Sequence, residues 1–398
     1  MKTNSLFQRC LQWLTRLLLA SGLVGALVMN DPGQLLAQRG NNIDPHPPTA
    51  LTTPPEPTST NSLVLLFPQL KRLPAPPWLR EGVRVTYVTS SALIGGENPS
   101  GSMGYTQYDL VALDKTSAVS TANFIFDAGG DGVLSTAPST PAVDIPGAGA
   151  YWLNPQVLKN AEAVANDDLT VTRMVDHDQA GRNYDVVRFQ YDNENSRMAS
   201  AFDTKSGILV FFTQTIVNTN GTRSEAQLRL AGQRQLKVPW QGRTLPNWLK
   251  AGQNFSYAGG ETTIIAGGDP LTLPSALNVA IKQVGKRYTT ATITTYANNI
   301  ASASTLQVSG MAQIVGSIWL PPEAFNSKLR TGRIDRDPLT GVEVGWQRDD
   351  QGNVVITETS SGWTSILTYD KRSGALLAIQ NTRRVGVATL ITKLALQK

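Results

Sequence analysis

Cysteine and histidine are almost missing from this chain of 398 residues. The single cysteine, Cys10, stands in front of an apolar stretch near the N-terminus, and the rest of the sequence has no thiol. Disulfides, thiolate metal sites and cysteine nucleophiles are therefore excluded for everything that follows. The two histidines are His46 and His177. A Ser-His-Asp hydrolase would depend on His177, and the G-x-S-x-G motif that presents such a serine is absent.

Nucleotide and metal motifs are missing as well. The sequence contains neither G-x-G-x-x-G nor the Walker pattern of a phosphate-binding loop. Asp176 and Asp178 have the spacing of calcium-loop ligands. However, Ala180 and Val187 stand where that loop needs an oxygen ligand and its closing glutamate. We therefore expect neither a bound metal nor a cofactor.

The chain has only a small excess of positive over negative charge. The formal net charge of +5 falls to +3 without residues 1–37, which contain Lys2, Arg9, Arg16 and Asp31. This balance gives no electrostatic footprint for nucleic acid, which is excluded as a partner. The densest basic stretch, Lys328–Arg336, is interpreted as the solvated end of a helix.

Long apolar runs are also lacking. The stretch over residues 17–29 has 13 residues, whereas a membrane helix needs roughly 20. It follows a basic start, as the core of a signal peptide does. We predict that residues 1–37 are a signal peptide cleaved after Ala37, and that the protein is exported to the periplasm or the cell exterior. A retained anchor is the alternative, and no transmembrane segment is expected after signal removal.

Residues 38–77 are rich in proline and threonine. Proline fixes φ and removes a backbone donor, so this segment is predicted to be a linker, largely disordered. Within it, Leu63–Phe67 is expected to pack as a short strand against the body of the protein.

What the sequence does contain is an internal repeat. Four pairs of blocks recur in the same order in the two halves. They are PPWLREGVRVTY from Pro76 and PNWLKAGQNFSY from Pro246, SALIGGENP and TIIAGGDP, YWLNPQVL and IWLPPEAF, and AFDTKSGIL and TYDKRSGAL. We therefore predict two copies of one module, over residues 78–240 and 245–398.

Each copy alternates polar and apolar residues and is rich in threonine, valine and aromatics, as half-buried strands are. The turns Asp203–Gly207 and Asp370–Gly374 predict bulged hairpins. One short helix per copy is expected, from Pro155 toward Asn166 and from Pro321 or Pro322 to near Gly332. The predicted fold is mainly β: two tandem curved antiparallel sheets, half-barrel or sandwich-like, of about six to eight strands each.

Five residues are candidate binding or interface positions: Trp240, Glu97, Asp269, Trp152 and Trp319. Trp152 and Trp319 could clamp a sugar or a lipid, but their place before the helices favours a structural role. Glu97 and Asp269 follow paired glycines that could form a ligand loop or simply a hairpin tip. Trp240 lies in the short apolar connection between the copies, so we predict that the copies pack as a fixed pair and bury it near their interface. A ligand site is then expected beside that interface.

The repeated residues shape a backbone and do not include an acid–base set; Asp127 and Asp131, for example, have no counterpart in the second copy. The sequence favours an exported, non-enzymatic binding or cell-envelope interaction protein, whose partner is a protein, a glycan or an apolar ligand. Its expected architecture resembles periplasmic lipid- and lipoprotein-carrier folds, without a shared motif. The alternatives are a secreted hydrolase that uses two carboxylates and an outer-membrane β-barrel.

Overall fold

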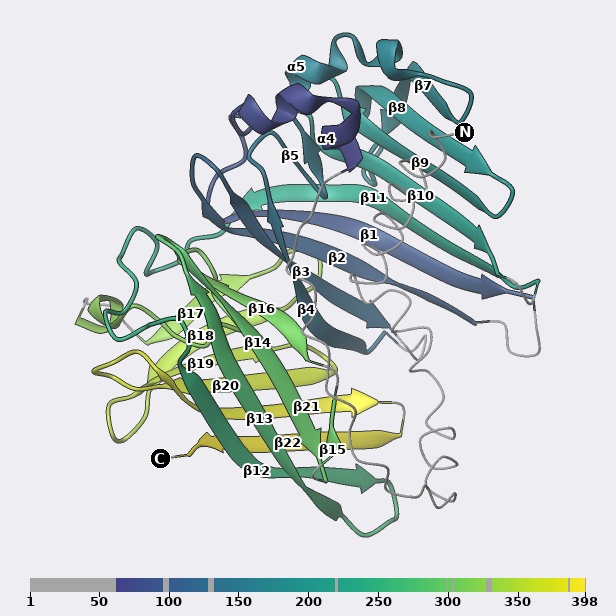
Figure 1. Cartoon of the computed structure of the whole chain (residues 1–398). Coiled ribbons are helices and arrows are strands. Elements are labelled where there is room, and N and C mark those ends of the chain that lie inside the picture. Colours follow the sequence, from purple (N-terminus) through teal and green to yellow (C-terminus); the bar gives the residue numbers. More distant parts are fainter. Residues whose placement is uncertain are drawn as a thin grey trace, which may run out of the picture.

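The computed structural model describes residues 62–398, except 96–99, 128–131, 219–220, 299, 303, 327–330, 386 and 398. Two large, open antiparallel sheets make up most of this part of the chain, and its helices are few and short (Figure 1). The predicted fold class is confirmed. The predicted signal peptide and most of the predicted linker lie outside the described residues.

The first sheet has nine strands within the described residues, in the order β4-β3-β2-β1-β11-β10-β9-β8-β7. The strands are β1 (Val83–Ile94), β2 (Ser100–Leu113), β3 (Ala118–Asp127), β4 (Leu134–Asp144), β7 (Leu169–His177), β8 (Asn183–Asn193), β9 (Ser196–Asp203), β10 (Leu209–Val217) and β11 (Arg223–Gln235). A small separate ladder joins β5 (Ala148–Gly149) to β6 (Trp152–Leu153).

The second sheet has eleven strands by the same description, in the order β15-β14-β13-β12-β22-β21-β20-β19-β18-β17, with β16 also paired to β14. The strands are β12 (Asn254–Ile265), β13 (Leu271–Val284), β14 (Tyr288–Ala297), β15 (Ile300–Ala301), β16 (Thr305–Gly310), β17 (Gly332–Arg336), β18 (Glu343–Arg348), β19 (Val354–Thr359), β20 (Trp363–Tyr369), β21 (Leu376–Val385) and β22 (Ala388–Leu396). Each sheet has more strands than the six to eight that the alternation indicated.

The two sheets repeat one topology, because the first strand of each pairs with its last in the middle of the sheet. Matching tyrosines also join the first strand of each sheet to the strand before the last, β10 or β21. The hydroxyl of Tyr87 donates to the carbonyl of Leu209 at 2.9 Å, and that of Tyr257 donates to the carbonyl of Leu376 at 3.0 Å. We call β1–β11 with their preceding helices the first module, and β12–β22 the second module.

The predicted bulged hairpins are present in both modules. In the first, the Asp203 carboxylate accepts from the backbone N–H of Ser206, and Gly207 adopts φ +73. In the second, Asp370 accepts from the N–H of Ser373, and Gly374 adopts φ +72. A Cβ on Gly374 would meet the carbonyl oxygen of Leu320 at 1.9 Å, so both the dihedral and the space require glycine.

The paired tryptophans before β1 and β12 also hold these hairpins. The indole of Trp78 donates to the carbonyl of Ser206 at 2.7 Å, and that of Trp248 donates to the carbonyl of Ser373 at 2.6 Å. Each tryptophan thereby joins the start of its module to a turn far along the chain. This contact explains why the repeated blocks contain tryptophan.

The helices are shorter than predicted. In the first module, Asn154 caps α5 (Pro155–Leu158) by accepting from the N–H of Gln156, and a 3-10 helix, η3 (Ala161–Val164), follows. In the second, η4 (Pro322–Asn326) is a single 3-10 segment. The helix end predicted over Lys328–Arg336 is wrong in its described part, because Gly332–Arg336 forms β17.

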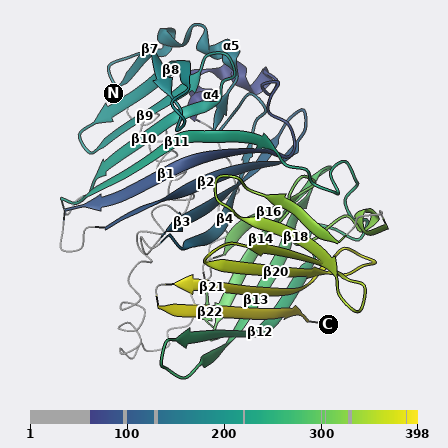
Figure 2. The same ribbon diagram turned by 180° about the vertical axis from the view of Figure 1, so that it is seen from behind.

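The last residues of the predicted linker are structured. Ser62–Leu66 forms helix α4 and not a strand, and 3-10 helix η2 (Pro68–Arg72) follows it. Val64, Phe67 and Leu70 are buried in the core of the first module. Both helices α4 and α5 lie on the side of the first sheet that faces away from the second module (Figure 1, Figure 2). We call this side of the first sheet its inner face.

Asp144, at the end of β4, is a buried carboxyl in this core, with 5% of its surface exposed. Its Oδ2 atom has no hydrogen-bond partner among the described residues. Burial raises the pKa of Asp144 to about 7, and a hydrogen bond from the backbone of Ala150 offsets this rise only in part.

We expect Asp144→Asn to stabilise the protein at pH 8 and to have little effect near pH 4. Between pH 4 and 7 the unfolded chain ionises this carboxyl while the folded chain keeps its proton, so the stability of the wild type falls as the pH rises. The full difference is up to about 4 kcal/mol above pH 7. Urea unfolding of both proteins at several pH values tests this. Equal stability losses on raising the pH would contradict it.

Candidate functional site

We call the opposite side of the first sheet its outer face, and the side of the second sheet that carries the core residues Tyr257 and Leu394 the inner face of the second sheet. The outer face of the first sheet packs against the inner face of the second. On β1 and β2, Tyr87 and Tyr108 point into the first core, and the alternating residues Arg84, Gln107 and Asp109 point the other way. Arg84 and Gln107 bond to Asp337, which lies just after β17 of the second module. Because side chains alternate along a strand, the polar residues of β1 and β2 lie on the face that contacts the second module.

An ion-pair cluster joins the modules at this face. Arg84 holds Asp109 with two hydrogen bonds of 2.6 and 2.7 Å. Arg234, on β11, holds Asp335 across the interface with two bonds of 2.7 Å. Asp337 lies between them and accepts from Arg234 at 2.9 Å, from Gln107 at 3.0 Å and from Arg84 at 3.3 Å. All the charges are thus paired in a buried or half-buried place, as such charges require.

Asp337 is the central acceptor, and its side chain is 1% exposed. Burial acts to raise its pKa. The charge of Arg84, the N–H of Thr340 and the charge of Arg234 outweigh that effect and lower the pKa of Asp337 to about 2. It is therefore ionised at neutral pH.

Apolar contacts on both sides of the cluster also join the modules. Val111, Ala112 and Val119 of the first module form one cluster with Tyr288 and Val308 of the second. A second cluster contains Ile125 of the first module with Val342 and Trp363 of the second.

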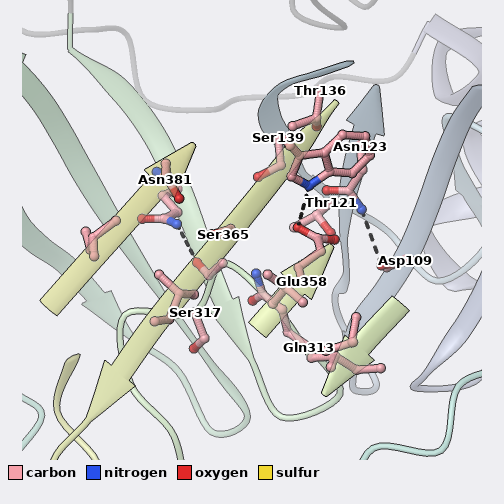
Figure 3. Close-up of a pocket in the computed structure, with 18 of the residues that line it drawn as sticks. Asp109, Thr121, Asn123, Thr136, Ser139, Gln313, Ser317, Glu358, Ser365 and Asn381 are labelled. Carbon is pink, nitrogen blue, oxygen red and sulfur yellow. Dashed lines mark hydrogen bonds between the residues drawn. The ribbon is translucent and has the colours of Figure 1, made fainter. Parts of the chain in front are cut away.

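A cavity of about 450 Å³ lies between the modules (Figure 3). Strands β1–β4 of the first module contribute a mainly polar side, and β13, β14, β16–β22 and the segment 313–318 of the second module contribute the rest. Figure 3 shows Asp109, Thr121 and Asn123 of the first module on the side opposite Asn381 and Ser365 of the second. Its size lies within the range of small-molecule sites.

The second module gives this cavity an aliphatic floor, formed by Leu277, Ile293, Leu367, Leu376 and Ile379. Register relates these positions to the first module, where Phe212 pairs with Leu228 as Ile379 pairs with Leu394. In the same way, Thr295 pairs with Leu277 in the second module at the position where Phe124 pairs with Thr106 in the first. The inner face of the first module is thus richer in aromatics.

The helices also cover the inner face of the first module more than that of the second. In the first module, the ring of Phe67 packs edge-on against Phe189 at 6.0 Å, which covers part of the inner face. The segment 232–236, which precedes Trp248 by the same distance as α4 precedes Trp78, is instead the end of β11 and its connection. The second module therefore lacks this cover within the described residues.

Glu358 is a half-buried acid on the cavity wall. The indole of Trp363 donates to its Oε2 at 3.4 Å. Burial raises the pKa of Glu358 above its usual range, and the hydrogen bond from Trp363 and the charge of Arg84 offset this rise only in part. Among the described residues, no group of three or more His, Cys, Asp or Glu side chains could hold a metal ion.

The residues singled out from the sequence are dispersed. Trp152 and Trp319 are buried in the two separate cores, where their indoles donate to the carbonyl of Pro146 and to the hydroxyl of Thr289. Asp269 is exposed at the turn between β12 and β13. Glu97 lies outside the described residues.

Trp240 is 2% exposed and belongs to the core of the second module. Its indole donates to the carbonyl of Gln313 at 3.0 Å, and Gln313 lines the cavity. The cavity residues themselves were missed, because alternation along a strand does not reveal what will cover its outer face.

Within the described part of the chain, no helix is long and apolar enough to cross a membrane.

No known protein family matches the sequence. No curated protein matches it either. Among solved structures, the chain is similar to a protein of unknown function from the DUF3598 family of Nostoc punctiforme, with 13% identity, 79% of this chain and 96% of that chain covered, and a TM-score of 0.14.

A putative AttH from Nitrosomonas europaea has 9% identity, covers 81% of this chain and 99% of its own, and gives a TM-score of 0.16. A putative outer membrane protein from Bacteroides fragilis has 8% identity, with 78% and 96% covered and a TM-score of 0.13. Similarities this low carry no functional argument.

We expect Asp337→Asn to lower the free energy of unfolding by about 3–5 kcal/mol, because it leaves Arg84 and Arg234 without their shared buried charge. Since the pKa of Asp337 is lowered, this contribution is full above pH 4 and is lost as the pH falls toward 2. Urea unfolding at pH 7 measures it. The matched control is Glu343→Gln, which removes exposed ion pairs to Arg333 and Arg336 and should cost at most about 1 kcal/mol. Equal effects of the two variants would contradict a central role for Asp337.

Proposed function

We propose that this is a non-enzymatic binding protein of the cell envelope, and that the cavity between its modules binds a small amphipathic molecule. The observation that carries the proposal is the division of the cavity into an aliphatic floor from the second module and a mainly polar wall to which both modules contribute. Such a division suits a ligand with an apolar body and a polar end.

The state of the acids supports binding over hydrolysis. A paired-carboxylate hydrolase needs one carboxylate free to act as nucleophile or base and a second one that carries a proton. In this cavity two guanidinium nitrogens of Arg84 bond to the two carboxylate oxygens of Asp109. Arg234 holds Asp335 in the same way. Glu358 is a suitable proton carrier, but its neighbouring acids are engaged in ion pairs. The arrangement therefore favours a ligand site.

The cell-envelope part of the proposal rests on the N-terminal pattern of basic residues followed by an apolar stretch. We expect export from a bacterial host to yield a mature protein that begins at Gln38, which N-terminal sequencing of the exported fraction would detect. An intact N-terminus in a protein that stays in the cytoplasm would count against this part alone.

Filling the cavity should weaken binding without unfolding the protein. Ile379→Phe places on the floor the residue that the first module carries at the matched position, Phe212. The probe is N-phenyl-1-naphthylamine, an uncharged apolar dye whose fluorescence rises when it leaves water. We expect saturable binding by the wild type and affinity at least about tenfold weaker in Ile379→Phe, which corresponds to about 1.4 kcal/mol.

The matched control is Ala378→Phe. Residue 378 is next on the same strand but faces the other side of the sheet, and the first module carries Phe211 there. This variant should bind the dye as the wild type does. The proposal is wrong if the wild type binds no dye saturably, or if Ile379→Phe, with an unchanged melting temperature, binds it equally well.

A further inference from the structure

Strand β21 crosses the cavity from an apolar to a charged end. Its alternate residues Ile379, Asn381 and Arg383 all line the cavity, because successive second residues share one face of a strand. Arg383 pairs in register with Trp363 on β20, which also lines the cavity. Ile379 and Arg383 are four residues apart, or roughly 13 Å at the usual rise of an extended strand. The apolar floor and the Arg383 cation are thus separated by a distance that a single ligand molecule can span.

Arg383 differs from the other arginine of the cavity. Arg84 is fully engaged by Asp109 and Asp337. Arg383 lines the cavity with an exposed side chain, and none of the described residues forms an ion pair or hydrogen bond with its guanidinium. A guanidinium at the edge of a cavity with no partner of its own is available to bind an anion, for which its fork of N–H donors is well suited.

This cation belongs to the second module only. Ser196 in the first module occupies the position of Trp363, and its partner there is Ile216, so isoleucine stands where the second module has Arg383. The charge is therefore not needed to build the repeated fold. It appears in the module whose inner face borders the cavity.

The acids of the cavity do not cancel this charge. Asp109 and Asp335 are neutralised by Arg84 and Arg234. Burial raises the pKa of Glu358, which favours its uncharged form. An anion that enters beside Arg383 thus meets little repulsion.

We propose that the ligand is an anionic amphiphile, whose carboxylate or phosphate head binds Arg383 while its hydrocarbon chain lies on Leu277, Leu367 and Ile379. This inference rests on the proposed ligand-binding function. It adds the charge of the head group and the direction in which the ligand lies along β21.

The test compares ligands that share one chain and differ in the head: laurate, lauryl phosphate and lauryl alcohol, each displacing N-phenyl-1-naphthylamine from the full chain. We expect the better of the two anions to bind about tenfold more tightly than the alcohol, as for a charge-assisted hydrogen bond. The tighter anion distinguishes a fatty-acid source from a phosphate-bearing lipid. In Arg383→Gln this advantage should vanish, while the affinity for the alcohol stays unchanged.

Arg384→Gln is the matched control, because residue 384 makes the same change one position along β21, on the opposite face. It should keep the preference for the anion. The inference is overturned if neither anion binds better than the alcohol, or if Arg383→Gln keeps the preference. If the alcohol and the dye both fail to bind the wild type, the proposed function itself is wrong.

Discussion

The buried charge cluster around Asp337 is the constraint on which the arrangement of the modules depends. Burying one arginine beside one acid costs desolvation energy that good geometry barely recovers. Here two arginines of the first module, one from β1 and one from β11, share Asp337 of the second module, so the cluster is satisfied in a single relative placement. That placement sets the outer face of the first sheet over the inner face of the second, and the cavity follows from it.

The two copies of the module share one backbone fold but differ in many side chains. The tyrosine, tryptophan and hairpin contacts that close each sheet are the same in both copies. Residues that touch only the inner face differ, since Phe212 and Ile216 correspond to Ile379 and Arg383. The inner face of the first module is packed, while that of the second module borders the cavity. This difference leaves the fold intact, because the contacts that close each sheet lie at other residues.

Local chemistry was predictable from the sequence, and placement was not. The turn at Asp203, the cap at Asn154 and the left-handed glycines depend on neighbours within a few residues, so their motifs identified them. The apolar run before Phe67 is too short for its periodicity to distinguish helix from strand. Arg84 and Asp109 resemble solvent-facing residues of half-buried strands, and only the contact with the second module makes them part of a site. The covering of one module by another leaves no local pattern.

The closure of each sheet by its first and last strands has a consequence for the order of folding. Val83 pairs with Gln235, and Tyr257 pairs with Leu396, so a ribosome must synthesise nearly a whole module before its central ladder can form. Contacts of such sequence separation are slow to form, and until then the strands on either side have open edges. A partly made module therefore lacks its central ladder, and the unpaired edges of its strands stay open to pairing with other chains until its last strand is complete.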